Sequence, residues 1–191
     1  MESAFVSSLP VEDVLSILRG IADDLKLGMG LDVAASDLFR DGAYHWEKEG
    51  VIRDREAQLD YIEELAQTFD IYYLEDPLEE NDPEGFQELQ KRVSGIVVGD
   101  DLFATNEDYL VPGVGGIIIK YNQRGSIVET VRTVKKARSM GMKIIVSHRS
   151  GETEDTFLSH FAVAMGADFA KIGAAGIRIV KINELLRIYG S

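Results

Sequence analysis

The chain has 191 residues, of which 45% are hydrophobic and 28% are charged, a composition typical of globular proteins. Its 33 acidic and 20 basic residues give a formal net charge of −13, which repels a nucleic-acid backbone. The lack of cysteine excludes disulfides and thiolate metal sites, and no apolar run reaches the roughly 20 residues of a membrane helix. Because the N-terminus also lacks signal-peptide features, we expect a cytoplasmic protein.

Helix and strand patterns alternate along the chain. The first helix is predicted from apolar residues with helical spacing, namely Val14, Ile17, Leu18, Ile21 and Leu25. A buried strand over residues 28–33 follows, and residues 37–53 are predicted to form a polar loop or a small hairpin. After a second helix that ends near Phe69, the remaining predicted strands cover residues 71–75, 96–100, 117–120, 143–146 and 169–172. The helices between and after these strands are predicted near residues 83–92, 106–111, 126–139, 153–165 and 178–188.

This alternation is typical of a parallel sheet, because each helix carries the chain back to the start of the next strand. We therefore predict an α/β fold, a portion of a TIM-type (β/α) barrel with about six βα units in one domain, residues 1–191. A closed barrel of this kind has about eight strands, so the predicted barrel is incomplete and has two open edges. Self-association, a second chain that completes the barrel, or a flat doubly wound sheet would each resolve this.

Each predicted strand ends in a polar residue or is followed directly by one. These residues are Asp32, Glu75, Asp100, Lys120, the run His148-Arg149-Ser150, and Lys171. Taken singly, an acid after a strand is more often a helix cap or a solvated loop residue. Six consecutive strands of this kind favour a site, because the carboxyl ends of barrel strands face one mouth, where active sites are built.

The residue types at these strand ends predict a particular chemistry. Three carboxylates without cysteine or a histidine cluster form an oxygen site that suits Mg²⁺ rather than zinc. Asp76 and Asp101 directly follow Glu75 and Asp100, so the sequence leaves the ligand open at both positions. An amine beside a dication can act as a general base near neutral pH, which suits removal of a proton next to a carboxylate with metal ions holding the resulting ene-diolate.

Five segments of the chain resemble enolase. They are residues 30–36 (GLDVAAS), 74–77 (LEDP), 98–102 (VGDDL) together with Thr105 and Asn106, 119–123 (IKYNQ) and 146–156 (VSHRSGETEDT). The last segment is the most specific, because related families with other substrates do not carry it. The similarity covers nearly the whole chain, which is thereby identified as a member of the enolase family.

The resemblance implies a magnesium-dependent phosphopyruvate hydratase of glycolysis. It assigns the metal ligands as Asp32, Glu75 and Asp100. Lys120 is implied to abstract the C2 proton of 2-phosphoglycerate, and Lys171 to help hold the substrate carboxylate. The resemblance also places His148, Arg149 and Ser150 along the substrate site, with Arg149 contacting the phosphate.

The chain departs from the family pattern in several places. Only Glu2 matches the family's N-terminal acidic loop, whose glutamate assists departure of the C3 hydroxyl. The family's N-terminal domain and first two barrel strands have no counterpart, and residues 171–178 differ from the family where the last strand turns into its helix.

Two hypotheses follow. The first is a working hydratase whose barrel is completed by self-association into a homo-oligomer or by a second chain. The second is a catalytically inactive enolase-like protein that binds magnesium or anions or has a regulatory role. Retention of the metal ligands and the base lysine favours the first hypothesis, and the run from His148 to Ser150 disfavours a substrate other than a phosphorylated acid.

Overall fold

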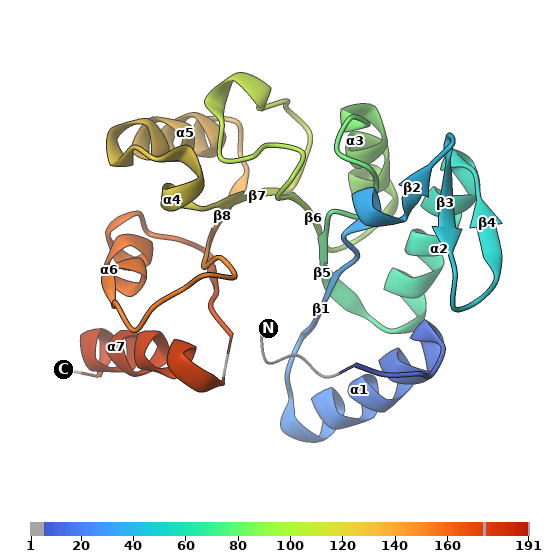
Figure 1. Cartoon of the computed structure of the whole chain (residues 1–191), viewed down its shortest axis with the longest axis horizontal. Coiled ribbons are helices and arrows are strands. Elements are labelled where there is room, and N and C mark those ends of the chain that lie inside the picture. Colours follow the sequence, from blue (N-terminus) through green and yellow to red (C-terminus); the bar gives the residue numbers. More distant parts are fainter. Residues whose placement is uncertain (1–5, 174, 191) are drawn as a thin grey trace. The chain divides into compact units, whose positions relative to one another are not determined.

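The structure is a computed structural model that describes residues 6–173 and 175–190 (Figure 1). These residues form two compact units. The first unit contains residues 6–102 and 111–115, and the second contains residues 103–110 and 116–190. Glu2, the predicted acid for the leaving group, lies outside the described residues. The single domain expected from the sequence stays a prediction.

The first unit contains three parallel strands with helices before and between them, and a small antiparallel sheet. Its helices and 3₁₀ turn are α1 (Val11–Leu25), η1 (Ala35–Leu38), α2 (Arg55–Thr68) and α3 (Pro83–Arg92). Its parallel strands are β1 (Met29–Asp32), β5 (Ile71–Glu75) and β6 (Ile96–Gly99), paired in the order β1-β5-β6. The small sheet consists of β2 (Phe39–Arg40), β3 (Ala43–Trp46) and β4 (Val51–Arg53).

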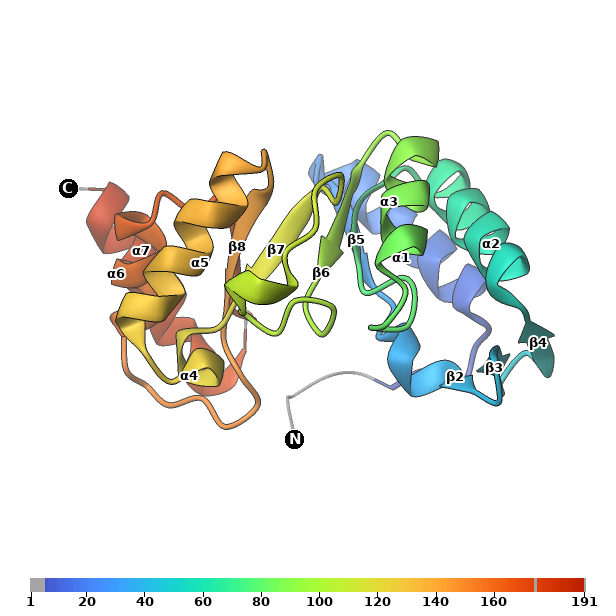
Figure 2. The ribbon, with the colours of Figure 1, turned by 90° about the horizontal axis from the view of Figure 1, so that it is seen from above.

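Helices α2 and α3 cover β5 and β6 (Figure 2). Each helix begins at an aspartate whose carboxylate accepts a backbone N–H of the first turn: Asp54 accepts from Ala57 and Asp82 from Gly85, both at 2.9 Å. The core between the helices and the strands is made of Leu59, Ile62, Leu65, Leu74, Phe86, Leu89, Val97 and Val98, all at most 2% exposed. Burial of these side chains supplies most of the stability of the unit.

The segment after β1 forms the hairpin that the sequence left as one of two possibilities. Asp41 and Gly42, both with positive φ, make the turn between β2 and β3. β4 pairs with β3, and Arg53 on β4 stacks over the Tyr61 ring of α2 at 3.6 Å from its centre. Trp46 donates to Gln58 Oε1 at 2.9 Å, which ties the small sheet to α2.

The second unit contains three further parallel strands and their helices. The strands are β7 (Gly116–Ile119), β8 (Lys143–Ser147) and β9 (Phe169–Lys171), paired in the order β7-β8-β9. The helices are α4 (Tyr121–Arg124), α5 (Ile127–Ser139), α6 (Phe157–Ala164) and α7 (Ile179–Tyr189), with 3₁₀ turns η2 (Glu107–Tyr109) and η3 (Gly176–Arg178). All four residues of β7 are buried, as is typical of a parallel strand covered on both faces.

The helix predicted over residues 106–111 is wrong. Only the short turn η2 forms there, because Asn106 caps it by accepting the N–H of Asp108 and the chain is extended again at Leu110. The sequence also missed the single-turn helix α4, which Gly125 ends in the left-handed conformation.

Helix α1 is present as predicted, but most of the apolar face that predicted it is exposed. Leu15 and Ala22 are its buried residues. By contrast, Ile17, Ile21 and Leu25 are 56%, 51% and 62% exposed, and Leu18 is 46% exposed. A helix that exposes this much apolar surface on one side has a face suited to packing against another element.

The fold class is therefore an α/β fold of parallel βα units, and the described residues contain six such strands, as predicted. This number is short of the eight strands of a complete (β/α) barrel. Within the described ranges, no helix is both long and apolar enough to cross a membrane.

Asp168, directly before β9, contacts the first two residues of β8. Asp168 accepts the N–H of Ile144 at 2.9 Å and the ammonium of Lys143 at 2.8 Å. Partial burial acts to raise the pKa of Asp168, but these two donors outweigh it and hold the pKa below the ordinary value of 3.8. The stabilisation is therefore fully present above pH 3.8 and is lost as the pH falls through the lowered pKa.

We expect Asp168→Asn to lower the free energy of unfolding by about 1 kcal/mol at pH 7, because one accepted hydrogen bond and the ion pair are lost. Urea denaturation followed by circular dichroism measures the change. The difference from the wild type should shrink as the pH falls below 3.8. Asp24→Asn, at an exposed position of α1, is the control. An equal loss in both variants would contradict the assignment.

Candidate functional site

Three of the predicted metal-ligand residues lie at the carboxyl ends of neighbouring strands in the first unit. Asp32 ends β1 and is the register partner of Glu75, which ends β5. Glu75 is also the partner of Val98 on β6, and Asp100 follows two residues after Val98. Because adjacent parallel strands lie about 4.8 Å apart, this register gathers the three carboxylates at one edge of the strands. Glu75 and Asp100 are 1% and 7% exposed, and Asp32 is exposed.

The pKa of Tyr73 is affected by all three carboxylates. Its hydroxyl donates to Glu75 Oε2 at 2.7 Å. Burial raises the pKa of Tyr73, and the negative charges of Glu75, Asp32 and Asp100 raise it further. Gly30, the register partner of Tyr73, leaves room for the ring, since a Cβ at Gly30 would stand 3.2 Å from Tyr73 Cδ1. Tyr73 thus orients the Glu75 carboxylate within the acidic group.

Asp76 has a different structural role from its neighbour Glu75. Its two carboxylate oxygens accept the backbone N–H groups of Asp100 at 2.9 Å and Asp101 at 3.0 Å. Burial raises the pKa of Asp76 to about 7, against the lowering effect of these two hydrogen bonds. Asp76 therefore fixes the backbone that carries Asp100.

A second grouping of carboxylates competes with the predicted one. Within the described residues, one oxygen from each of Asp76, Asp100 and Asp101 lies within 4.8 Å of the others. Both carboxylate oxygens of Asp76 already accept backbone hydrogen bonds. By contrast, the charges of Asp32, Glu75 and Asp100 all raise the pKa of the Tyr73 hydroxyl. We therefore favour Asp32, Glu75 and Asp100 as the ligand set, with Asp76 as the group that positions it.

The predicted basic residues lie at the strand ends of the second unit. Ile119 pairs with Val146, so Lys120 directly after β7 is level with Ser147, and Ser147 is the register partner of Lys171 at the end of β9. Lys120 and Lys171 therefore flank the end of β8, from which His148 continues. Lys120, His148 and Lys171 are half-buried, whereas Arg149 and Ser150 are exposed.

Thr105 holds the backbone of Lys120 in place. Its buried Oγ1 accepts the Lys120 N–H at 2.9 Å and donates to Gln123 Oε1 at 3.0 Å. Thr105 itself has a positive φ of 54°, and its carbonyl accepts the Thr133 hydroxyl of α5 at 3.2 Å. This left-handed conformation is unfavourable for a β-branched residue, so the surrounding hydrogen bonds must stabilise it.

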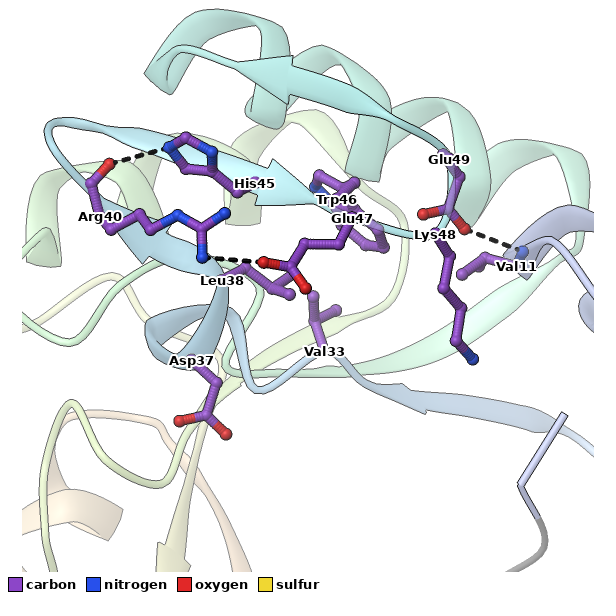
Figure 3. A pocket seen from close by; sticks show the side chains of 10 residues that line it. All are labelled: Val11, Val33, Asp37, Leu38, Arg40, His45, Trp46, Glu47, Lys48 and Glu49. Carbon is purple, nitrogen blue, oxygen red and sulfur yellow. Dashed lines mark hydrogen bonds and ion pairs between the residues drawn. The ribbon is translucent and has the colours of Figure 1, made fainter. Parts of the chain in front are cut away.

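A cavity of about 340 Å³ lies beside the small sheet and is lined by Val33, Trp46 and Glu49, among others (Figure 3). Its charged residues are largely paired: Arg40 with Glu47 at 2.9 Å, and Glu49 with the Val11 N–H at 3.4 Å. None of the predicted site residues lines it. The strand ends, rather than this cavity, are the candidate functional site.

Parallel βα units with carboxylates at three strand ends and basic residues at three others define the class: a portion of a (β/α) barrel with the parts of a hard-cation site. Comparison with known proteins makes this more specific. Residues 15–191 match the family described as enolase, C-terminal TIM barrel domain. The enolases of Archaeoglobus fulgidus, Pyrobaculum aerophilum and Methanosphaera stadtmanae are 41%, 40% and 42% identical over 98% of this chain.

The chain therefore belongs to the enolase family. It spans about half the length of these curated relatives, covering 49%, 48% and 46% of them.

We expect Tyr73→Phe to weaken Mg²⁺ binding by about tenfold or more, because the hydroxyl that orients Glu75 is lost. Isothermal titration calorimetry with MgCl₂ measures the affinity. Tyr72→Phe is the matched control, since Tyr72 is the preceding residue of the same strand and its side chain points to the opposite face. Equal affinities in the two variants would contradict the role of Tyr73.

Proposed function

We propose that this chain supplies the catalytic residues of an Mg²⁺-dependent enolase, which dehydrates 2-phosphoglycerate to phosphoenolpyruvate. The observation that carries the proposal is the register, which aligns Asp32 with Glu75 on one set of strands and Ser147 with Lys171 on another, next to Lys120. The family match and the enolase relatives support the same activity.

The donor set fits magnesium. Asp32, Glu75 and Asp100 offer only carboxylate oxygens, which are the ligands that Mg²⁺ prefers. Two of them are buried, and gathering negative charge at a buried place is costly unless a cation offsets it. When bound, the metal would neutralise the charge that develops on the substrate carboxylate.

Lys120 is the base in the proposed reaction. Its amine takes the proton from C2 of the substrate, and the electron pair moves into the carboxylate to give an ene-diolate. The C2–C3 double bond then forms as the C3 hydroxyl leaves with a proton as water. Lys171 and Arg149 offer cationic donors to the carboxylate and the phosphate, and His148 and Ser150 line the substrate. Glu2, the acid expected for the leaving hydroxyl, lies outside the described residues.

The second candidate is a protein that binds Mg²⁺ and a phosphorylated acid without turning it over. The exposed apolar face of α1 favours it for the isolated chain, because a protein that needs further βα units to exclude water loses rate without them. The cytoplasmic location expected from the sequence stays a prediction.

We expect the protein to form phosphoenolpyruvate from 2-phosphoglycerate in the presence of Mg²⁺, as measured by ultraviolet absorbance. Lys120→Ala should lower kcat by at least about a hundredfold, because the base is lost. Lys135→Ala, on the exposed side of α5, should leave it unchanged. If the wild type binds Mg²⁺ and is folded but has no more activity than Lys120→Ala, the hydratase proposal fails for this chain and the binding role replaces it.

We further propose that α1 and the free edge of β1 pack against βα units of an enolase-family polypeptide. Among the described residues, β1 has a strand neighbour, β5, on one side only. A helix that precedes a parallel strand crosses over in a right-handed sense, so the position beside β1 lies under α1. Ile17, Ile21 and Leu25 of α1 expose apolar surface, and the relatives contain about as many residues again as this chain matches.

We expect this chain to form a complex with the half of the Archaeoglobus fulgidus enolase that it does not match, with a gain in hydratase activity. Light scattering after size-exclusion chromatography measures the mass. Ile21→Asp should weaken the complex because it puts a charge into the apolar contact, while Val128→Asp, at an exposed site on α5, should not. If the chain instead forms a homodimer that Ile21→Asp dissociates, the partner of α1 is a second copy of this chain. A monomer in every mixture would refute the contact.

A further inference from the structure

The loop that carries three predicted substrate residues is held by two basic side chains from elsewhere in the second unit. The loop, residues 148–156, runs from β8 to α6. Arg178 ends the turn η3 and Lys181 lies in the first turn of α7. They are three residues apart and so lie on one side of the helix start. Arg178 is 6% exposed and Lys181 is fully buried.

Arg178 contacts the first residue of the loop. Its Nε donates to His148 Nδ1 at 2.9 Å, and its Nη2 lies 3.5 Å from the carbonyl oxygen of Ser150. A guanidinium only donates hydrogen bonds, so Nδ1 must accept and the imidazole proton must sit on Nε2. In the alternative tautomer, Nδ1–H would donate to the Arg149 carbonyl at 3.2 Å. The Nδ1–H and the Arg178 Nε–H would then point at each other, two donors without an acceptor between them. Arg178 therefore selects the tautomer of His148.

Lys181 holds the second half of the loop. Its ammonium donates to the Thr153 carbonyl at 2.5 Å and lies 3.6 Å from Glu152 Oε1. The Lys181 carbonyl accepts the Ser159 hydroxyl of α6 at 2.8 Å, which fixes α7 against the helix that follows the loop. A buried ammonium is stable only with such partners, so the loop must keep this conformation.

The same loop lies close to the residue that follows the proposed base. Burial raises the pKa of Tyr121, and the charges of Glu152 and Asp155 raise it further. Tyr121 also packs edge-on against Phe157 at the start of α6, with ring centres 5.1 Å apart. The end of the loop, where α6 begins, thus lies against Tyr121 in the segment that follows β7.

We propose that Arg178 and Lys181 are positioning residues that hold residues 148–153 in the conformation that binds the anionic substrate, with His148 fixed as the Nε2–H tautomer. This inference rests on the proposed function for its effect on catalysis. It assigns a role to the segment in which the chain departs from its family pattern, since Arg178 closes that segment.

Nuclear magnetic resonance tests the tautomer directly. The chain has three histidines, and His148→Gln assigns the His148 signals. With the imidazole neutral, multiple-bond ¹⁵N–¹H spectra of the wild type should show His148 as the Nε2–H form. Arg178→Met should give mixed tautomers and changed amide signals for residues 148–153. Arg178→Lys, which keeps a donor, should recover the Nε2–H form at least in part, and Arg187→Met, at an exposed site on α7, should behave as the wild type.

Kinetics provides the second readout. Arg178→Met should raise the KM for 2-phosphoglycerate on the order of tenfold and change kcat less, because the loop still forms but is misplaced. If Lys181→Met does not fold, Lys181→Met with Glu152→Gln removes both buried charges and tests the same contact. The inference is overturned if Arg178→Met keeps the wild-type tautomer and loop signals. If the wild type has no hydratase activity, the proposed function fails, and the tautomer measurement still decides the role of Arg178.

Discussion

Parallel pairing of neighbouring strands is the constraint on which the rest of this structure depends. Parallel strands all end at the same edge, and each helix must return the chain to the opposite edge before the next strand begins. Within each unit, charged residues at the ends of neighbouring strands are therefore brought close to one another. A register slip of one residue would turn Glu75 to the other face of β5, away from Asp32.

Much of the fold follows from local patterns. The bounds of α3 agree with the sequence because Asp82 and Pro83 begin it and its apolar residues have a clear helical period. The strands are equally predictable, since each is a short apolar run that ends in a polar residue or is followed directly by one. The segment around residues 103–110 was not, because its conformation depends on Thr105, whose hydroxyl and carbonyl bond to residues far along the chain. Sequence spacing carries no signal for such contacts.

The residues of the candidate site divide in the same way. Those at strand ends could be found from the sequence, whereas those that position them mostly could not. Tyr73 is an exception in principle, since a residue two before Glu75 on a strand shares its face. Asp76 was read as a competing ligand, and only its hydrogen bonds to the backbone of Asp100 and Asp101 separate the two roles. Arg178 and Lys181 act across about 30 residues of chain, through contacts that no local pattern encodes.

The positioning groups share a physical property that bears on function. Asp76, Arg178 and Lys181 are charged side chains that are at most 6% exposed, and each hydrogen-bonds the backbone or a ring of a loop next to a strand end. Burial of an ionisable group is costly, and replacing buried charged groups by apolar ones is often neutral or stabilising. An apolar core in place of these three side chains could therefore give a similar free energy of unfolding. What they do supply is a single loop conformation, because the cost is offset only when every partner is in place. A protein that merely packed a barrel would not need the loops after β6 and β8 held in this way. Loops held in one conformation at the strand ends are what the proposed recognition of a small charged substrate requires.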